Sequence, residues 1–313
     1  MRSIRASAGA LLLAAALAVA ACGGDDNGRP GSAQPQGADL RITLGTQNFT
    51  EAIVLGELWR QALAANGYAV DLRKNMGPLE EVDAAMRAGE IDGHPAYIGA
   101  SLSVVAGEES AGLDAEETYR QLKAFYAKRG QTLSAMTPYE NVDAIATTRL
   151  FAQRERLRTV ADLRRLDRFT LGARPEFEER YQGLAGMQKV YGLTNARFKP
   201  IALSAQYGAL DAGDVDAVNV FTTDPQLAEN DYAVLEDPER LFGSQRVAMV
   251  VDTKKLDLVG REEFLDVVAD VNRRLTTRVM VEMNEAVELD GQDEADVAAR
   301  FLREEGILRG QGR

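Results

Sequence analysis

The sequence predicts an α/β protein of two lobes, and three observations support this prediction. At 313 residues the chain is too long for one ordinary core and fits two lobes of roughly 100–150 residues each. From Leu40 on, short β-rich segments alternate with segments of helical periodicity, which is typical of α/β layers. One helix–turn–strand pattern occurs twice, as AMRAGEIDGHPAY ending at Tyr97 and as ALDAGDVDAVNVF ending at Phe221.

The first elements follow this alternation closely. RITLG at 41–45 predicts a strand, and EAIVLGELWRQALAANG at 51–67 predicts an amphipathic helix that ends at its final glycine. A second strand is expected at 69–76 and a second helix at 79–89. The segment IDGHPAY then leads into a cleft.

The same alternation returns in the second half of the chain. Further strands and helices are expected at 142–148, 169–175, 177–192, 198–203, 206–213 and 215–221. RVAMVVD at 246–252 predicts a last strand, and the C-terminal 60 residues have a helical pattern throughout.

The repeated pattern suggests where a ligand binds. Ligands of open α/β sheets lie beyond the carboxyl ends of strands, so Tyr97 and Phe221 would form two walls of one pocket. The alternative is that the two rings fill separate cores and resemble each other by accident.

The first residues indicate export. A basic MRSIR is followed by an apolar stretch too short to span a bilayer and then by small residues before Cys22, the only cysteine. This resembles a bacterial lipoprotein signal at 1–21, with acylation of Cys22 as the only membrane anchor; the alternative is an ordinary signal peptide with an incidental cysteine. Residues 22–38 are rich in Gly, Pro and polar residues and predict a flexible tether.

Composition and motifs argue against several functions. The net charge of −12 and the lack of a basic run argue against a nucleic-acid partner. The only histidine is His94, for which a structural or surface role in a crossing segment is expected, and no nucleophile, metal or dinucleotide motif is present. The acidic pairs at 80–81 and 108–109 are interpreted as solvated faces. An enzyme and a cofactor are therefore not expected.

Four segments carry a resemblance to a known family: GTQNFTEAIVLGE, AGEIDGHPAYIGAS, LGARPEFEERYQGLAGMQKVYGL and VDAVNVFTTDPQL. From about Ile42 to Gly306 the chain resembles the substrate-binding lipoproteins of osmoprotectant ABC importers, of the glycine betaine/choline-binding type. The resemblance implies a two-lobed fold like that of type II periplasmic binding proteins, with two crossings between lobes. It places lobe 1 at 39–141 plus 246–313 and lobe 2 at 142–245.

The family holds a trimethylammonium group in a box of tyrosines, because a quaternary ammonium has no N–H to donate and binds the faces of aromatic rings. Tyr97 matches one box tyrosine, and Phe221 keeps the ring of another without its hydroxyl. Asp143 stands where a third is usual, and Gln245 replaces a fourth. Ala100 replaces a threonine that some relatives have.

At the other end of the ligand, the resemblance implies that Arg180 reaches a carboxylate and that Asn141 is a polar cleft residue at the lobe crossing. Gln47 lies just before a helix start at which Asn48 and Glu51 have the form of a capping box. Free N–H groups at that helix end would favour an anionic group.

The predicted function is therefore the capture, outside the cytoplasm, of a quaternary ammonium or a similar zwitterionic osmolyte between two lobes. The expected partners are an ABC permease and its ATPase. The carboxylate of Asp143 leaves another class of ligand open, because it would accept an amine, a guanidinium or an imidazolium as readily as a betaine. A module that reports ligand occupancy to a separate receptor is a further alternative.

Overall fold

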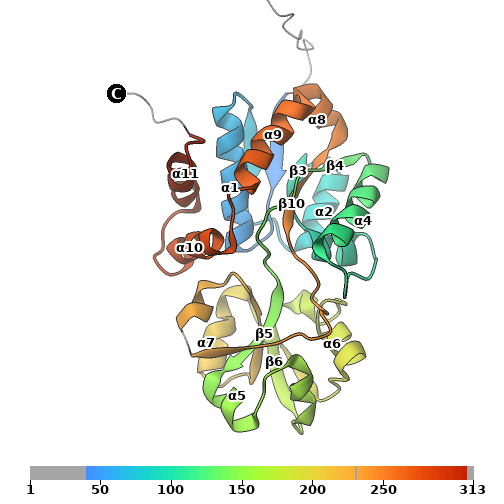
Figure 1. Ribbon diagram of the computed structural model, residues 1–313, viewed down its shortest axis with the longest axis vertical. Helices are drawn as coiled ribbons and strands as arrows, with labels where there is room; N and C mark the ends of the chain where they lie inside the picture. The colour runs from blue at the N-terminus through green and yellow to red at the C-terminus, as the bar shows by residue number, and fades with distance from the viewer. Residues whose placement is uncertain (1–39, 230, 309–313) are drawn as a thin grey trace, which may run out of the picture. The chain divides into compact units, whose positions relative to one another are not determined.

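The computed structural model describes residues 40–229 and 231–308, which belong to one compact unit. The predicted signal peptide 1–21, the tether 22–38 and the Cys22 acylation site lie outside the described residues. Figure 1 shows strands and helices alternating around two separate sheets, which confirms the predicted α/β class.

The first sheet has the strand order β2-β1-β3-β10-β4. Its strands are β1 (Ile42–Gly45), β2 (Val70–Arg73), β3 (Gly93–Tyr97), β4 (Gln131–Leu133) and β10 (Val247–Asp252). Its helices are α1 (Thr50–Ala65), α2 (Leu79–Arg87), α3 (Ile98–Ala100), the π-helical turn Ser101–Val105, α4 (Ala115–Lys128), α8 (Thr253–Val259), α9 (Arg261–Asn272), α10 (Thr277–Glu288) and α11 (Glu294–Glu304). β1, β2 and β3 are parallel, and β10 runs antiparallel to β3 and β4.

The second sheet has the order β7-β6-β8-β5-β9. Its strands are β5 (Asp143–Thr148), β6 (Phe169–Ala173), β7 (Ala196–Pro200), β8 (Ala217–Phe221) and β9 (Tyr232–Leu235). Its helices are α5 (Arg149–Glu155), α6 (Leu184–Tyr191) and α7 (Gln206–Asp211), with 3-10 turns at Val160–Arg165, Pro175–Phe177, Leu203–Ala205 and Pro225–Glu229. β6, β7 and β8 are parallel, and β5 is antiparallel to β8 and β9.

The two sheets therefore repeat one topology, with β3 and β8 as their central strands. The chain passes to the second sheet between β4 and β5 and returns between β9 and β10. These two crossings lie side by side, because Glu140 forms a bridge with Arg246 and the Asn141 backbone N–H donates to the Gln245 carbonyl at 3.2 Å.

Apolar side chains cover both faces of each sheet. Under α1 and the C-terminal helices, the core of the first sheet contains Trp59, whose indole N–H donates to the Asn272 side chain at 2.8 Å. On the opposite face, Tyr126 of α4 is fully buried. The second sheet has its largest core around Phe169 and Phe177.

Two expectations about local structure are wrong. The helix expected at 177–192 begins at Leu184, because the chain turns so tightly before it that a Cβ on Gly183 would lie 2.1 Å from the Phe177 carbonyl oxygen. The crossing segment expected for His94 is also wrong: the residue is fully buried in the central strand β3, where its Nδ1 lies 2.9 Å from the Pro95 carbonyl, so of the two expected roles only the structural one fits.

Candidate functional site

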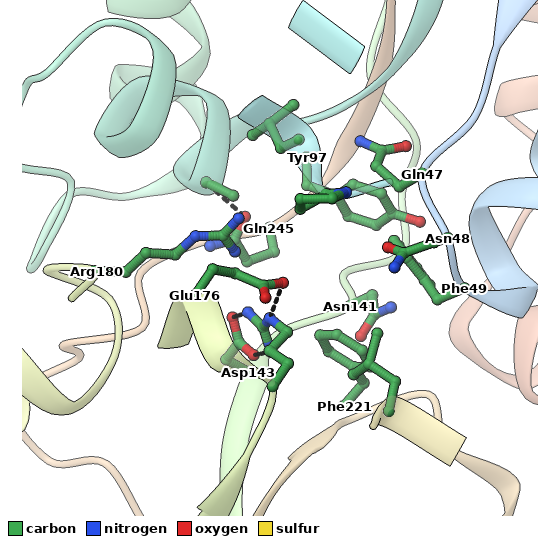
Figure 2. A pocket seen from close by; sticks show the side chains of 15 residues that line it. Gln47, Asn48, Phe49, Tyr97, Asn141, Asp143, Glu176, Arg180, Phe221 and Gln245 are labelled. Carbon is green, nitrogen blue, oxygen red and sulfur yellow. Dashed lines mark hydrogen bonds and ion pairs between the residues drawn. The ribbon is translucent and has the colours of Figure 1, made fainter. Parts of the chain in front are cut away.

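The seven residues that the sequence predicts for ligand binding line one cavity of about 60 Å³, which we call the inner cavity. Figure 2 shows their side chains gathered around it from both sheets. They are Gln47, Tyr97, Asn141, Asp143, Arg180, Phe221 and Gln245. The wall also contains Asn48, Phe49, Pro78, Leu79, Ala100, Arg174, Glu176 and Leu203.

The two aromatic residues of the repeated pattern occupy equivalent positions. Tyr97 is the last residue of β3 and Phe221 is the last residue of β8, and these are the central strands of their sheets. Both rings line the inner cavity, so the expectation of two walls from two matching strand ends is confirmed. Tyr97 also belongs to the apolar core of the first sheet.

Phe49 completes the aromatic wall and was not predicted from the sequence. Its ring stacks on Phe221 with centroids 5.4 Å apart and is tilted against Tyr97 at the same distance. The three rings thus form a continuous surface. The signal was present: a large aromatic residue stands among polar residues in the turn between strand β1 and helix α1, where ligands of such sheets lie.

Asp143 does not stand alone in the cavity. Its carboxylate accepts hydrogen bonds from both terminal nitrogens of Arg174, at 2.8 and 3.1 Å, and from the Asn219 side chain at 2.9 Å. Arg174 and Asp143 are 7% and 8% exposed, so this is a buried ion pair. The guanidinium also lies 5.2 Å from the Phe221 ring centroid and 3.3 Å from Glu176.

Arg174 was not predicted from the sequence, although its position contained a clue. It directly follows β6, which runs parallel to β8, so its side chain emerges at the same sheet edge as Phe221. Asp143 comes to that edge because β5 is antiparallel to β8, in a register that sets it opposite Phe221.

Arg180 is also paired. Its Nε and one terminal nitrogen donate to Glu80 of α2 at 3.1 and 2.7 Å. Glu80 is exposed, as expected of a solvated face, but it is an ion-pair partner across the two sheets. Glu109, from the other acidic pair, likewise pairs with Lys189, at 2.8 Å.

The amide residues of the wall are held by their own hydrogen bonds. Gln245 accepts from the Ala100 backbone N–H at 2.9 Å and donates to Gln182 and the Phe242 carbonyl. The Gln47 amide nitrogen donates to the Pro95 carbonyl at 2.9 Å. The amide oxygens of Gln47 and Asn141 are buried without a partner.

The expected capping box at the start of α1 is wrong. Phe49 occupies the N-cap position and no side chain caps the helix. Glu51, which is 2% exposed, points inward instead and accepts hydrogen bonds from five side chains at 2.6–3.2 Å. The donors are Tyr97, Tyr139, Asn141, Thr223 and Asn284. Burial raises the pKa of Glu51, and the hydrogen bonds oppose that increase.

A second cavity of about 590 Å³, the outer cavity, adjoins the inner one across Phe49 and Phe221, which line both. Its wall includes four carboxylates: Glu51, Glu176, Asp224 and Glu288. Asp224 accepts from the Phe221 backbone N–H at 3.0 Å and from the Tyr207 hydroxyl at 2.8 Å. Burial raises the pKa of Asp224 to about 7.

Asp224 should make the protein less stable at neutral than at acidic pH. Between pH 4 and 7 the folded state keeps a proton that the unfolded chain has lost, so the free energy of unfolding falls as pH rises, by up to about 4 kcal/mol from this group. Asp224→Asn removes the titration, and urea unfolding of the variant at pH 4 and pH 7 should show a smaller difference than in the wild type. An equal change in the free energy of unfolding between pH 4 and pH 7 in the two proteins would contradict the raised pKa of Asp224.

Among the described residues, no three His, Cys, Asp or Glu side chains are grouped as metal ligands. In the same part of the chain, no helix has the length and apolar character needed to cross a membrane.

Comparisons with known proteins match most of the chain. Residues 41–304 match the family described as substrate binding domain of ABC-type glycine betaine transport system. The glycine-betaine-binding protein of Pseudomonas aeruginosa is 30% identical over 279 residues, covering 85% of this chain and 88% of that protein. The glycine betaine-binding protein YehZ of Escherichia coli is 24% identical over 285 residues, covering 87% and 93%. A crystal structure of a glycine betaine/carnitine/choline ABC transporter protein superposes with a TM-score of 0.69 at 21% identity, covering 85% of this chain and 99% of the other.

Proposed function

Since the chain belongs to the family of substrate-binding domains of ABC-type glycine betaine transport systems, as its motifs predicted, we propose that it binds a quaternary-ammonium or similar osmolyte in the inner cavity. The family consists of substrate-binding proteins of transporters, and such proteins work outside the cytoplasm. The observation that carries the proposal is the convergence of Tyr97, Phe49 and Phe221 on one small cavity.

The rings account for recognition of the cationic group. A quaternary ammonium is attracted to the negative faces of aromatic rings, by about 0.5–2 kcal/mol for each ring. Tyr97 comes from the first sheet and Phe221 from the second, so a ligand that contacts both favours their approach. Direct hydrogen bonds already link the part of the chain around the first sheet to the part around the second. One example is the bond from the Gln182 side chain to the Ser110 hydroxyl at 2.8 Å.

The remaining features of the proposal rest on the sequence. They are a signal peptide at 1–21, acylation of Cys22, a tether at 22–38, lobe 1 at 39–141 plus 246–313, and lobe 2 at 142–245. The bound osmolyte would pass to an ABC permease driven by its ATPase, without chemical turnover. Adjacent permease and ATPase genes would favour a role in import. The alternative is a sensor that reports ligand occupancy to a separate receptor.

Truncating either strand-end ring should weaken binding of the osmolyte. Tyr97→Ala and Phe221→Ala are each expected to cost on the order of 1–2 kcal/mol of binding free energy, measured by isothermal titration calorimetry with glycine betaine and choline. Phe151→Ala, which removes a ring from α5 that lines neither cavity, is the matched control. Unchanged affinities in both cavity variants would exclude these rings from the site.

A further inference from the structure

The inner cavity offers no unpaired positive side chain to a ligand carboxylate, among the described residues that line it. Arg174 is held by Asp143 and Glu176, and Arg180 is held by Glu80. Three carboxylates therefore face two guanidinium groups, which leaves this cluster with a net negative charge. Such a cluster attracts cations and repels anionic groups.

The uncharged polar groups of the wall have the same preference. Gln47 and Asn141 are each 4% exposed, and their amide nitrogens donate to the Pro95 carbonyl and to Glu51. This fixes the orientation of both amides and leaves their oxygens without donors. A carboxylate, which has no O–H or N–H, supplies no donor to either oxygen.

The amino end of α1 is the remaining candidate for an anion. Its first turn, however, contains the buried Glu51, whose Oε1 accepts a hydrogen bond from the Tyr97 hydroxyl at 3.0 Å. In its ionised form, a carboxyl group in the first turn of a helix offsets the positive end of the helix dipole.

We propose that Glu80 occupies the guanidinium of Arg180 and thereby makes the inner cavity select a small cation with an O–H or N–H donor over a zwitterion that ends in a carboxylate. This rests on the proposed function and specifies its ligand. Choline is the simplest quaternary cation of this class, and glycine betaine is its counterpart with a carboxylate. Glu80 is thus a specificity-determining residue that acts through Arg180.

The Glu80–Arg180 pair is suited to this role because it bridges the two sheets at the cavity wall. The Arg180 side chain is 13% exposed, whereas that of Glu80 is 44% exposed. Removing the exposed partner leaves a guanidinium at the cavity wall, ready for a bidentate contact with a carboxylate. Because Glu80 lies on the surface of α2, this change should leave the fold intact.

The test is calorimetric titration of the purified protein with choline, glycine betaine and tetramethylammonium. The wild type should bind choline about tenfold or more tightly than glycine betaine, and about fivefold more tightly than tetramethylammonium, which lacks the hydroxyl. Glu80→Gln should bind glycine betaine about tenfold more tightly than the wild type does and so reverse or abolish the preference. Glu81→Gln changes the net charge equally on an exposed neighbouring residue and should leave the ratio unchanged.

The outcomes separate this inference from the proposed function. The proposed selectivity would be overturned, with the osmolyte site left in place, by either of two results. One is that the wild type binds glycine betaine as tightly as choline or more tightly. The other is that Glu80→Gln and Glu81→Gln have the same ratio of choline affinity to glycine betaine affinity. Failure of all three ammonium compounds to bind the wild type would overturn the proposed function itself, together with the selectivity that rests on it.

Discussion

Arg174→Met should lower the free energy of unfolding by about 3–5 kcal/mol at neutral pH, because it leaves the carboxylate of Asp143 buried without its cation. The methionine fills much of the volume of the arginine side chain, so the loss reports the charge rather than a cavity. Only the Asn219 side chain would remain as a close side-chain donor to that carboxylate among the contacts described. Urea-induced unfolding, followed by circular dichroism, measures the difference.

The double variant Asp143→Asn/Arg174→Met is the matched control. It removes both charges, and replacement of a whole buried ion pair is often neutral, so it should recover most of the stability that the single variant loses. Arg180→Met gives a second comparison, because the carboxylate that it abandons, Glu80, is exposed and can be solvated. Its loss should be about 1 kcal/mol or less. A loss of that small size for Arg174→Met would show that Asp143 is not a buried charge dependent on its partner.

The buried pair also shows where sequence reasoning about the site succeeds and where it stops. Tyr97 and Phe221 could be located because a repeated helix–turn–strand pattern identifies equivalent strand ends, and such ends meet ligands. The contact of Asp143 with Arg174 depends instead on the register of β5 against β8 and on the parallel pairing of β6 with β8. No local pattern in the sequence encodes which side chains these pairings bring together.

The fold could be predicted to a similar extent. The alternation of β-rich segments with segments of helical periodicity located most of the long elements, and the C-terminal helices are present as expected. The strands β4 and β9 were missed, since three or four residues at a sheet edge carry little periodicity. The helix α6 was predicted seven residues too long at its start because its periodicity continues through a tight turn, in which Gly183 and Gly186 lie close to backbone atoms of residues 177–181 just before them.

The contacts of Glu51 could not be predicted from the sequence, because its partners come from four separate segments of the chain. Tyr97, Tyr139 and Asn141 donate to one carboxyl oxygen, at 3.0–3.1 Å. The other oxygen accepts from Thr223 at 2.6 Å and from Asn284 at 3.2 Å. Because Thr223 follows β8 of the second sheet whereas α1 belongs to the first, the carboxyl group joins the two parts beside the aromatic wall.

Glu51→Ala is expected to lower the free energy of unfolding by about 3 kcal/mol or more. Each buried donor that loses its acceptor costs about 1–3 kcal/mol, and water from the outer cavity can replace only some of the lost bonds. Thr223→Val removes a single one of these donors with little change in shape, so its loss should be about 1 kcal/mol. Urea unfolding of both variants gives the comparison, and equal losses would show that Glu51 is no shared acceptor.

The pH dependence of the isosteric variant Glu51→Gln tests the protonation of this group. Burial raises the pKa of Glu51 above its ordinary value of 4.5, so the folded state retains a proton that the unfolded chain loses as pH rises past that value. The free energy of unfolding of the wild type should therefore fall with pH relative to that of Glu51→Gln, which does not titrate. Parallel urea titrations from pH 4 to pH 8 should show the wild-type advantage shrinking steadily. An advantage that grows with pH would mean that the five donors outweigh burial and that folding favours the carboxylate form.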